Sequence, residues 1–546
     1  MSFKVCESER QRIPAMAALG PHLMKRIGIS GLIDSYCPSS RSIVKPSNCI
    51  EVVAGVLFEG EQKPAVMNYS SYYVGTPTQK MFNSRIDPKN INATSISRSL
   101  DAIYELDRDE LTWKCHELCS GYFGLESNML FIDETNFAYY GDVPENVAED
   151  CPIPAFGGNS KTKQNNVRQY DVLGVANGNG ELVFSKPYDG NTSDKQMDKE
   201  AIDFIRDRVD PSLYTIVADS KMTDQNLIDD LIDGGFGFVL KVPKNYSDKL
   251  AERVVDVAKK RMSKSSRKGM TAYDGTMDTV NGPLRVVAYE FTAKTEKFAK
   301  DLIDKSKAKL VKALDGIEGH IFDSREEADD AITGIIESLG PIPFSIQANY
   351  RSVIVKEKWG KRGRPPKDWA PGDRQCWTVE PTFEVCEEIA SLMAQDQGIQ
   401  VLLTNLPARL GNPDPSENGN PRFGATAEEV VATYLQEYNV EWIFRMMKSG
   451  SGVDTVYLRT PERECAMIFI ISLVVSLKTS INARLKKTYG QYSDTIDGQA
   501  IKLRRLSLEY DPTSKDVYLV GSPELTSPYL RLLSDLDTDP DSLLLP

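Results

Sequence analysis

Acidic, aromatic and basic side chains are grouped within residues 434–448, in the segment YLQEYNVEWIFRMMK. On an ideal α-helix, positions four and seven residues apart lie within roughly 40° of one line. One helical face would therefore carry Tyr434, Glu437, Glu441, Arg445 and Lys448. A core helix would place Leu or Val there, whereas a site that binds a metal and a phosphate backbone would use these residue types. The alternative is an exposed helix in which Glu441 simply pairs with Arg445.

Two further acids each follow a short apolar segment. Asp133 ends MLFID, and Asp219 follows YTIVA. Together with Glu441 they would form a set of hard oxygen ligands, which suits Mg²⁺ and allows Mn²⁺ as a substitute. Two such ions, about 3.5–4 Å apart, can activate a water or a DNA 3′-hydroxyl and stabilise the leaving oxygen. Singly, each acid could instead end a strand or cap a helix.

The segments around these acids predict an α/β fold. The expected order is strand, strand, strand, helix, strand, helix, strand, at 129–133, 171–176, 181–186, 198–209, 214–218, 223–232 and 236–242. This order, with acids at the ends of the first and fourth strands, is that of the ribonuclease H-like fold. In that fold the two strands are neighbours in a mixed five-stranded sheet. We therefore expect Asp133 and Asp219 to lie close together.

The rest of the chain divides around this core. The predicted regions are a helical N-terminal domain for DNA binding or dimerisation, the first part of the catalytic core, an inserted domain, the second part of the core with Glu441, and a C-terminal region whose acidic tail we expect to be disordered. Their boundaries are 1–125, 126–242, 243–425, 426–490 and 491–546.

Charge is distributed unevenly along the 546 residues. The net charge of −13 argues against a nucleic acid partner. However, residues 241–268 contain ten Lys and Arg against three acids, and residues 356–367 contain six against one. The second stretch includes KRGRPPK, in which Arg362 and Arg364 resemble the minor-groove contacts of an AT-hook. A basic run is also typical of a solvated surface or loop, so both interpretations stay open.

Composition makes several other classes of protein improbable. Only three His are present, which disfavours a His-based general base, and no Walker-type phosphate loop is evident. Nine Cys are scattered, and the one tight group, Cys115, His116 and Cys119, is either a partial zinc site or ordinary helix. The longest apolar run, 466–477, is too short to span a bilayer and predicts a buried helix. No signal peptide is evident, so we expect a cytoplasmic protein without a membrane partner.

The acidic motifs resemble those of the DDE transposases of bacterial and archaeal insertion sequences. One large group of these enzymes has Tyr, two residues, Arg, three residues, Glu, six residues and Lys. Tyr434, Glu441 and Lys448 match that spacing, whereas Glu437 stands at the Arg position. Arg445, one turn further on, is the candidate to replace the lost phosphate contact. The segments FIDET, ADSKMTDQNL, GNTSD and TNLP also resemble landmarks of the family.

The resemblance implies a cut-and-paste transposase. Members bind terminal inverted repeats of double-stranded DNA as a homodimer in a synaptic complex, cut each end, and join the 3′-hydroxyls to target DNA. Asp133, Asp219 and Glu441 would bind two Mg²⁺ ions, with Tyr434 and Lys448 on phosphates, in a nucleoid-associated cytoplasmic enzyme. The alternatives are a ribonuclease H-like nuclease without strand transfer, and a transposase-derived DNA-binding protein without catalysis. Glu437 is the one hint of the latter.

Overall fold

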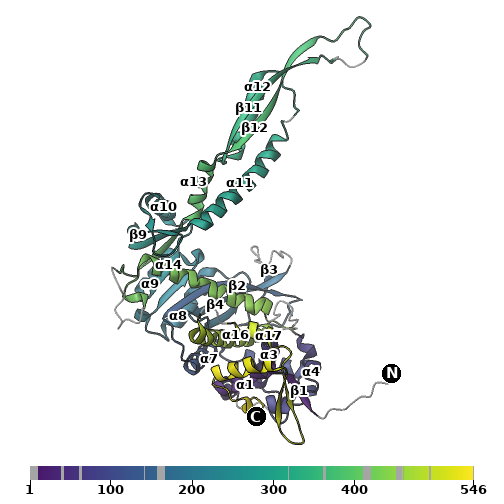
Figure 1. Ribbon diagram of the computed structural model, residues 1–546, viewed down its shortest axis with the longest axis vertical. Coiled ribbons are helices and arrows are strands. Elements are labelled where there is room, and N and C mark those ends of the chain that lie inside the picture. Colours follow the sequence, from purple (N-terminus) through teal and green to yellow (C-terminus); the bar gives the residue numbers. More distant parts are fainter. Residues whose placement is uncertain are drawn as a thin grey trace. The chain divides into compact units, whose positions relative to one another are not determined.

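The computed structural model describes most of the chain and divides it into two compact units (Figure 1). The first unit comprises Met1–Pro243 and Thr404–Pro546, and the second is Lys244–Leu403. Within these bounds the described residues are 10–37, 42–60, 64–140, 142–156, 167–317, 319–358, 360, 364–409, 420–450, 458, 460–490 and 494–544. The predicted catalytic acids all belong to the first unit.

Helices make up the N-terminal part of the first unit, as the sequence predicts. The longer ones are α1 (Ala15–Ile27), α2 (Ile29–Tyr36), α3 (Pro46–Glu59), α6 (Ala93–Tyr104) and α7 (Arg108–Phe123). Helices α1 and α3 approach closely because each has a glycine at the contact. A Cβ on Gly20 of α1 would lie 2.8 Å from the Phe58 ring, and one on Gly55 of α3 would lie 3.2 Å from the Ala17 carbonyl oxygen.

A mixed sheet forms the centre of the first unit. Its strands are β2 (Met129–Tyr139), β4 (Arg168–Asn177), β5 (Leu182–Tyr188), β6 (Thr215–Ala218) and β7 (Gly237–Lys241). They lie side by side in the order β5-β4-β2-β6-β7. Strand β4 is antiparallel to both β5 and β2, and β2, β6 and β7 are parallel. The short β3 (Ala155–Phe156) also pairs with β4. All five predicted strands are present, and β2 continues six residues beyond the predicted end.

The β4–β5 hairpin turns at the NGNG segment. The Asn177 side chain accepts hydrogen bonds from the backbone amides of Asn179, at 2.9 Å, and Glu181, at 3.1 Å. Gly180 has φ +81°, a left-handed conformation that favours glycine. These local contacts fix the register of the two strands.

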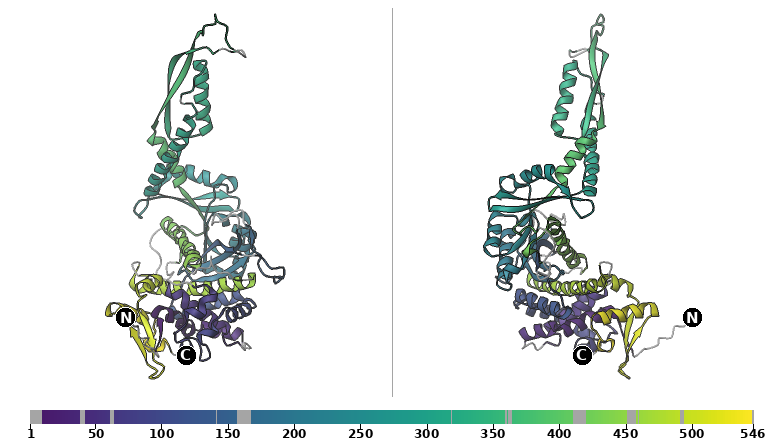
Figure 2. Two further views of the ribbon diagram at one scale, coloured as in Figure 1. Left: turned by 90° about the vertical axis from the view of Figure 1, so that its right-hand side faces the viewer. Right: turned by 60° about the vertical axis from the view of Figure 1, so that its left-hand side comes forward.

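Helices cover the sheet. They are α8 (Asp194–Arg206), α9 (Gln225–Asp233), α14 (Ala427–Tyr434), α15 (Tyr438–Arg445) and α16 (Pro461–Tyr489). Helix α16 lies between β5 and the N-terminal helices α3, α6 and α7 (Figure 2). Among the described residues it is the one helix long and apolar enough to cross a bilayer, and its apolar stretch is fully buried inside the unit. The buried helix predicted at 466–477 is therefore confirmed, as part of a longer element.

The C-terminal region is ordered, so the prediction of a disordered acidic tail is wrong. It contains α17 (Ile496–Lys502), β14 (Ser507–Tyr510), β15 (Val517–Val520) and α18 (Pro523–Asp535), and β14 also pairs with an N-terminal strand, β1 (Gln11–Pro14). Leu536, Leu543 and Leu544 are buried, whereas the acids between them are exposed. The acidic composition suggests disorder, but burial of a few spaced leucines holds this segment against the rest of the protein.

The second unit contains a small sheet with one helix, and a separate group of three helices with a long hairpin. The hairpin β9 (Met270–Thr279) and β10 (Gly282–Phe291) is flanked by β8 (Ser263–Lys264) and β13 (Gln400–Thr404) and is contacted by α10 (Leu250–Arg261). Helices α11 (Thr292–Leu314) and α13 (Glu387–Gly398) pack together, and α12 (Arg325–Leu339) packs on the long hairpin β11 (Phe344–Lys356) and β12 (Asp373–Val385) (Figure 1). Leu310, Phe322, Ile332, Phe344 and Val379 form a core there.

The insertion ends earlier in the structure than the sequence suggests. Its predicted interval was 243–425, whereas the second unit stops at Leu403. The reason is a pair of polar contacts to β7, because the Thr404 hydroxyl donates to the Phe238 carbonyl at 2.6 Å and the Asn405 amide donates to the Phe236 carbonyl at 2.8 Å. Thr404 and Asn405 are thereby bound to the central sheet.

Candidate active site

Asp133 and Asp219 lie at neighbouring positions on adjacent parallel strands. The register of β2 and β6 pairs Ile132 with Ala218. Asp133 is the next residue of β2, and Asp219 is the first residue after β6. Neighbouring strands are about 4.8 Å apart, so the two carboxylates emerge close together at this point of the sheet. Both side chains are partly exposed. Each of the two acids therefore keeps part of its side chain accessible to solvent.

Asp219 is held in its ionised form. Burial alone would raise the pKa of its carboxyl, but a hydrogen bond from the Ser220 backbone amide and the charge of Lys241 outweigh it, and the pKa is lowered. Lys241 Nζ lies 3.2 Å from Asp219 Oδ1 without the alignment of a hydrogen bond. That oxygen is buried, and the Lys241 ammonium is the cation beside it. Asp133 Oδ1 accepts a hydrogen bond of 2.8 Å from the backbone amide of Glu134.

The segment with Tyr434 and Glu441 is not the continuous helix that the sequence predicts. Helix α14 ends at Tyr434, a 3₁₀ turn spans Leu435–Glu437, α15 spans Tyr438–Arg445, and a π-turn spans Met446–Gly450. Each change of winding rotates the following side chains about the helix axis, so the five residues do not share one straight stripe. Interruptions of this kind are frequent at functional sites.

Glu437, rather than Glu441, carries the carboxyl that is electrostatically coupled to the two aspartates. Burial raises the pKa of Glu437 to about 7, with a hydrogen bond from Tyr434 opposing the rise and the charges of Asp219 and Asp133 adding to it. Glu441 is exposed on α15, one turn later. Glu437 therefore lies within the electrostatic influence of Asp133 and Asp219, and Glu441 follows one turn later on the same segment.

The predicted DNA-binding residues lie in three settings. Tyr434 is buried, and its hydroxyl is bonded to Glu437. Arg445 is exposed, and Lys448 Nζ lies 5.5 Å from the centre of the Phe137 ring on β2. Arg364 is exposed in the β11–β12 loop of the second unit, whereas Arg362 lies outside the described residues.

Sequence reasoning missed a second group of acids next to Asp133. Lys221 bridges Glu134 at 3.1 Å and Asp194 at 3.6 Å. Asp198 is only 2% exposed, and burial, together with the charges of Glu134 and Asp194, raises its pKa to about 8. The segments FIDET, GNTSD and ADSKM each contribute to this group, so three motifs that are far apart in the sequence meet here. No periodicity could have shown that, although the acids at their ends were visible.

The carboxylate pair has the donor chemistry for a hard divalent cation. Ionised carboxylates without His or Cys are the ligands that Mg²⁺ uses. Among the described residues, no three His, Cys, Asp or Glu side chains already surround a common point. An ion bound by Asp133 and Asp219 would therefore have to draw in a third carboxylate, and Glu437 and Glu441 are the candidates on the neighbouring segment.

The group Cys115, His116 and Cys119 belongs to the protein interior. Both cysteines are buried on α7, and His116 Nδ1 lies 3.4 Å from the fully buried Glu181 carboxylate. Glu181 also accepts hydrogen bonds from Ser120 at 2.5 Å, Asn177 at 2.7 Å and Ser480 at 2.7 Å. The ordinary structural interpretation of His116 therefore fits the structure better than a zinc ligand.

Replacing Glu181 with Ala is expected to destabilise the protein by about 3 kcal/mol, because it leaves several buried donors unpaired. The matched control is Glu117→Ala on the exposed side of α7, which should change stability by less than about 0.5 kcal/mol. Chemical denaturation of the full chain measures both. Equal effects of the two substitutions would contradict the central role of Glu181.

The Glu181 contribution should also depend on pH. Burial tends to raise its pKa, but the hydrogen bonds and the charge of His116 more than compensate, and the pKa is lowered. A carboxyl whose pKa is lower in the folded state stabilises the fold above its unfolded pKa and loses this effect as the pH falls through the folded value. The difference in unfolding free energy between wild type and Glu181→Gln should thus shrink in acid below about pH 4.5.

Comparison with known proteins adds one match. A family model described as a domain of unknown function, DUF4277, matches residues 17–115, from α1 into α7. It covers less than half of the chain and its description names no activity. No curated protein matches the chain. The chain is a mixed α/β protein whose central sheet carries two acids, Asp133 and Asp219, at neighbouring positions.

Proposed function

We propose that this chain is a DDE-type DNA transposase, which performs metal-dependent cleavage and strand transfer at the ends of an insertion sequence. The observation that carries the proposal is the placement of Asp133 and Asp219 at neighbouring positions of β2 and β6. In a two-metal phosphoryl transfer site, paired carboxylates are the main requirement. The activity, the partner DNA and the metal all belong to this proposal.

The sheet supports a ribonuclease H-like core. Its order, β5-β4-β2-β6-β7, has three antiparallel strands followed by two parallel ones. In a ribonuclease H-like core the first strand is central and the fourth lies beside it, and β2 and β6 take these places here. Such a core carries its first two catalytic acids on these two strands, and in this chain Asp133 lies within β2 while Asp219 directly follows β6. The ion pairs of Lys221 further support the family resemblance, because they join the segments FIDET, GNTSD and ADSKM, which all resemble family motifs.

In the proposed mechanism the residues near the site bind metal, position a carboxyl or contact phosphate. Asp133, Asp219 and Glu441 would hold two Mg²⁺ or Mn²⁺ ions, which when bound supply the activation of the attacking oxygen and the stabilisation of the leaving oxygen. Lys241 keeps Asp219 ionised. The role expected for Tyr434 changes, because its hydroxyl is committed to Glu437. We assign it to positioning this carboxyl, with phosphate contacts left to Arg445 and Lys448.

Basic surfaces of the second unit support DNA as the partner. Arg253, Lys260 and Arg261 line a hollow of about 510 Å³ between α10 and β9. The loop between β11 and β12 adds the exposed Arg364. Because phosphate contacts are local, clustered cations can bind DNA on a chain whose net charge is negative. The proposed complex is a homodimer that holds two transposon ends.

Substituting Ala for both Arg362 and Arg364 is expected to weaken binding to AT-rich duplex by at least tenfold. Loss of two phosphate or groove contacts should also reduce the slope of log K against log salt by about 2. The matched control is Arg351→Ala on β11, an exposed arginine that pairs with Glu380 at 3.7 Å. Binding isotherms at several salt concentrations decide between the AT-hook and a plain basic loop, which would leave the slope as in the control.

The function is tested with the purified full-length protein and a linear DNA that carries the inverted repeats flanking its gene. We expect Mg²⁺-dependent cuts at both ends and none with a chelator. Cuts without any joined product would favour the nuclease alternative. Specific binding without cuts under any divalent ion would favour the non-catalytic alternative, for which the acid at position 437 is the motivating feature.

A further inference from the structure

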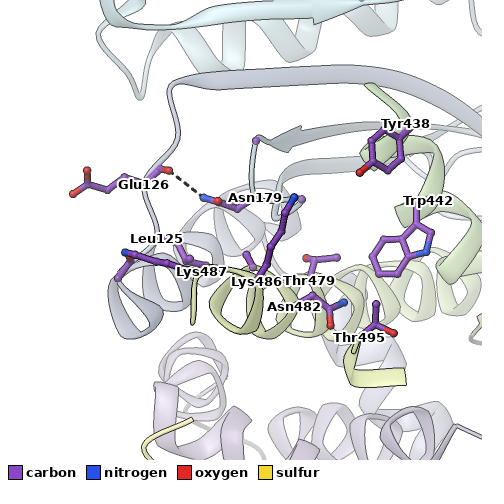
Figure 3. A pocket seen from close by; sticks show the side chains of 14 residues that line it. Leu125, Glu126, Asn179, Tyr438, Trp442, Thr479, Asn482, Lys486, Lys487 and Thr495 are labelled. Atoms are coloured by element: carbon purple, nitrogen blue, oxygen red, sulfur yellow. Dashed lines mark hydrogen bonds between the residues drawn. The ribbon is translucent and has the colours of Figure 1, made fainter. Parts of the chain in front are cut away.

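A cavity of about 750 Å³ opens in the first unit, on the side of α15 that bears aromatic residues (Figure 3). Helix α16 supplies one wall, and the loop after α7 and the β4–β5 turn supply others. The turn is fixed to the loop because Asn179 Nδ2 donates to the Glu126 carbonyl at 3.2 Å. A cavity of this volume is within the usual range for a small-molecule site.

Two aromatic side chains line one side of the cavity. Tyr438 and Trp442 are one turn apart on α15, and both side chains line the cavity drawn in Figure 3. Tyr438 is 61% exposed, a large fraction for an aromatic residue at a concave surface. Stacking of a nucleobase on such a side chain contributes about 1–3 kcal/mol per base and tolerates any base. The aromatic pair therefore favours a flat ligand.

Asn482 on α16 contributes a hydrogen-bond donor that has no partner. Its Oδ1 accepts from the backbone amide of Ile496 at 2.6 Å. Because that amide can only donate, the orientation of the side-chain amide is fixed and Nδ2 must point elsewhere. Nδ2 is buried and has no hydrogen-bond partner among the described residues. A buried donor without a partner is costly, and a ligand that accepts its hydrogen bond would remove this cost.

A positive charge lies at the same cavity. Lys486 is exposed on α16, and in the described part of the chain it makes no ion pair or side-chain hydrogen bond. Its neighbour Lys487 differs, because it donates to the Gly124 carbonyl at 3.0 Å and so holds the wall. The ammonium of Lys486 is thus available to an anionic group of a ligand in the cavity.

We infer that this cavity is a nucleotide-binding site, which takes a base against Trp442 and Tyr438 and a phosphate at Lys486. The donor on Asn482 would bond to an acceptor on the base edge. The same chemistry is offered by a free mononucleotide and by an unpaired nucleotide of a DNA strand. Only the second source depends on the proposed function, since a free nucleotide could bind whether or not the protein cuts DNA.

The test measures binding to the full-length protein in a chelator, so that no cleavage occurs. The probes are dAMP, dTMP, a 5′-phosphorylated single-stranded decamer and a blunt duplex of the same sequence. We expect Trp442→Ala, Asn482→Asp and Lys486→Ala each to weaken binding of the mononucleotides or the single strand at least tenfold. Trp442→Phe, which keeps an aromatic face, should stay within about threefold of wild type.

Asn482→Asp keeps an oxygen that accepts from Ile496, removes the donor and adds a negative charge that also opposes a bound phosphate. Thermal unfolding establishes that each variant is folded. Equal affinity for mononucleotide and single strand would assign a free nucleotide, and binding of the single strand alone would assign DNA. Absence of binding by all four probes, or unchanged affinity in Trp442→Ala and Asn482→Asp, would overturn the inference. Asp133→Asn should bind as wild type, so loss of cleavage and loss of this site are distinguishable.

Discussion

Asp133→Asn and Asp219→Asn should each lower the rate of Mg²⁺-dependent DNA cleavage by at least about three orders of magnitude. An Asn amide keeps the shape of the side chain but supplies no negative charge to a divalent ion. Both positions are partly exposed at the sheet, so neither substitution should unfold the protein. Single-turnover cleavage of labelled transposon-end DNA measures the effect, and gel shift measures binding of the same DNA.

The matched control for these substitutions is Asp233→Asn, which changes an exposed acid at the end of α9. It should cleave at the wild-type rate. End binding should stay within about threefold in all three variants, because the acids do not contact phosphates by themselves. Cleavage by Asp133→Asn at the wild-type rate would remove the pair of carboxylates from the proposed mechanism.

Glu441→Gln should abolish cleavage to a similar extent, whereas Glu437→Gln should retain at least about a tenth of it. Glu441 is exposed, so its carboxylate can turn to an ion without loss of an existing hydrogen bond. Glu437 is held by Tyr434 and is partly protonated at neutral pH, because burial raises its pKa to about 7. Protonation of Glu437 should reduce its repulsion by the charges of Asp133 and Asp219 when no ion is bound.

Profiles of cleavage rate against pH between about 6 and 8 separate the two glutamates further. If Glu437 titrates near the site, wild type should gain activity as the pH rises through about 7, and Glu437→Gln should flatten that part of the profile. Full activity in Glu441→Gln together with loss in Glu437→Gln would make Glu437 the third ligand. The third metal ligand of this chain would then lie one helical turn before the Glu position of the family motif.

The order of strands could be predicted because each strand is a short apolar segment with a turn signal beside it. The NGNG turn and the apolar segment before Asp219 are of this kind, and β6 and the β4–β5 hairpin lie where they indicate. The extension of β2 was missed because the residues after Asp133 are polar. They stay in the strand because β4 pairs with them along its whole length.

The candidate site could be predicted only in part. Neighbouring positions for Asp133 and Asp219 follow from the strand order, which the sequence shows. The 3₁₀ turn before α15 does not, because a pattern with a period of 3.6 assumes uniform winding. The burial of Glu437 and Asp198 also depends on contacts between distant segments. These are tertiary contacts, and the local pattern of a single sequence does not show which distant segments meet.

Strand transfer by the purified protein distinguishes a transposase from a nuclease and from a DNA-binding protein without catalysis. A pre-cut end with a free 3′-hydroxyl and a supercoiled target plasmid are incubated with Mg²⁺, and joined products are sequenced. We expect covalent joining of the 3′ end to target DNA by wild type, and none by Asp133→Asn. Wild type that binds and nicks the end but never joins it, across Mg²⁺ and Mn²⁺, would contradict assignment as a transposase.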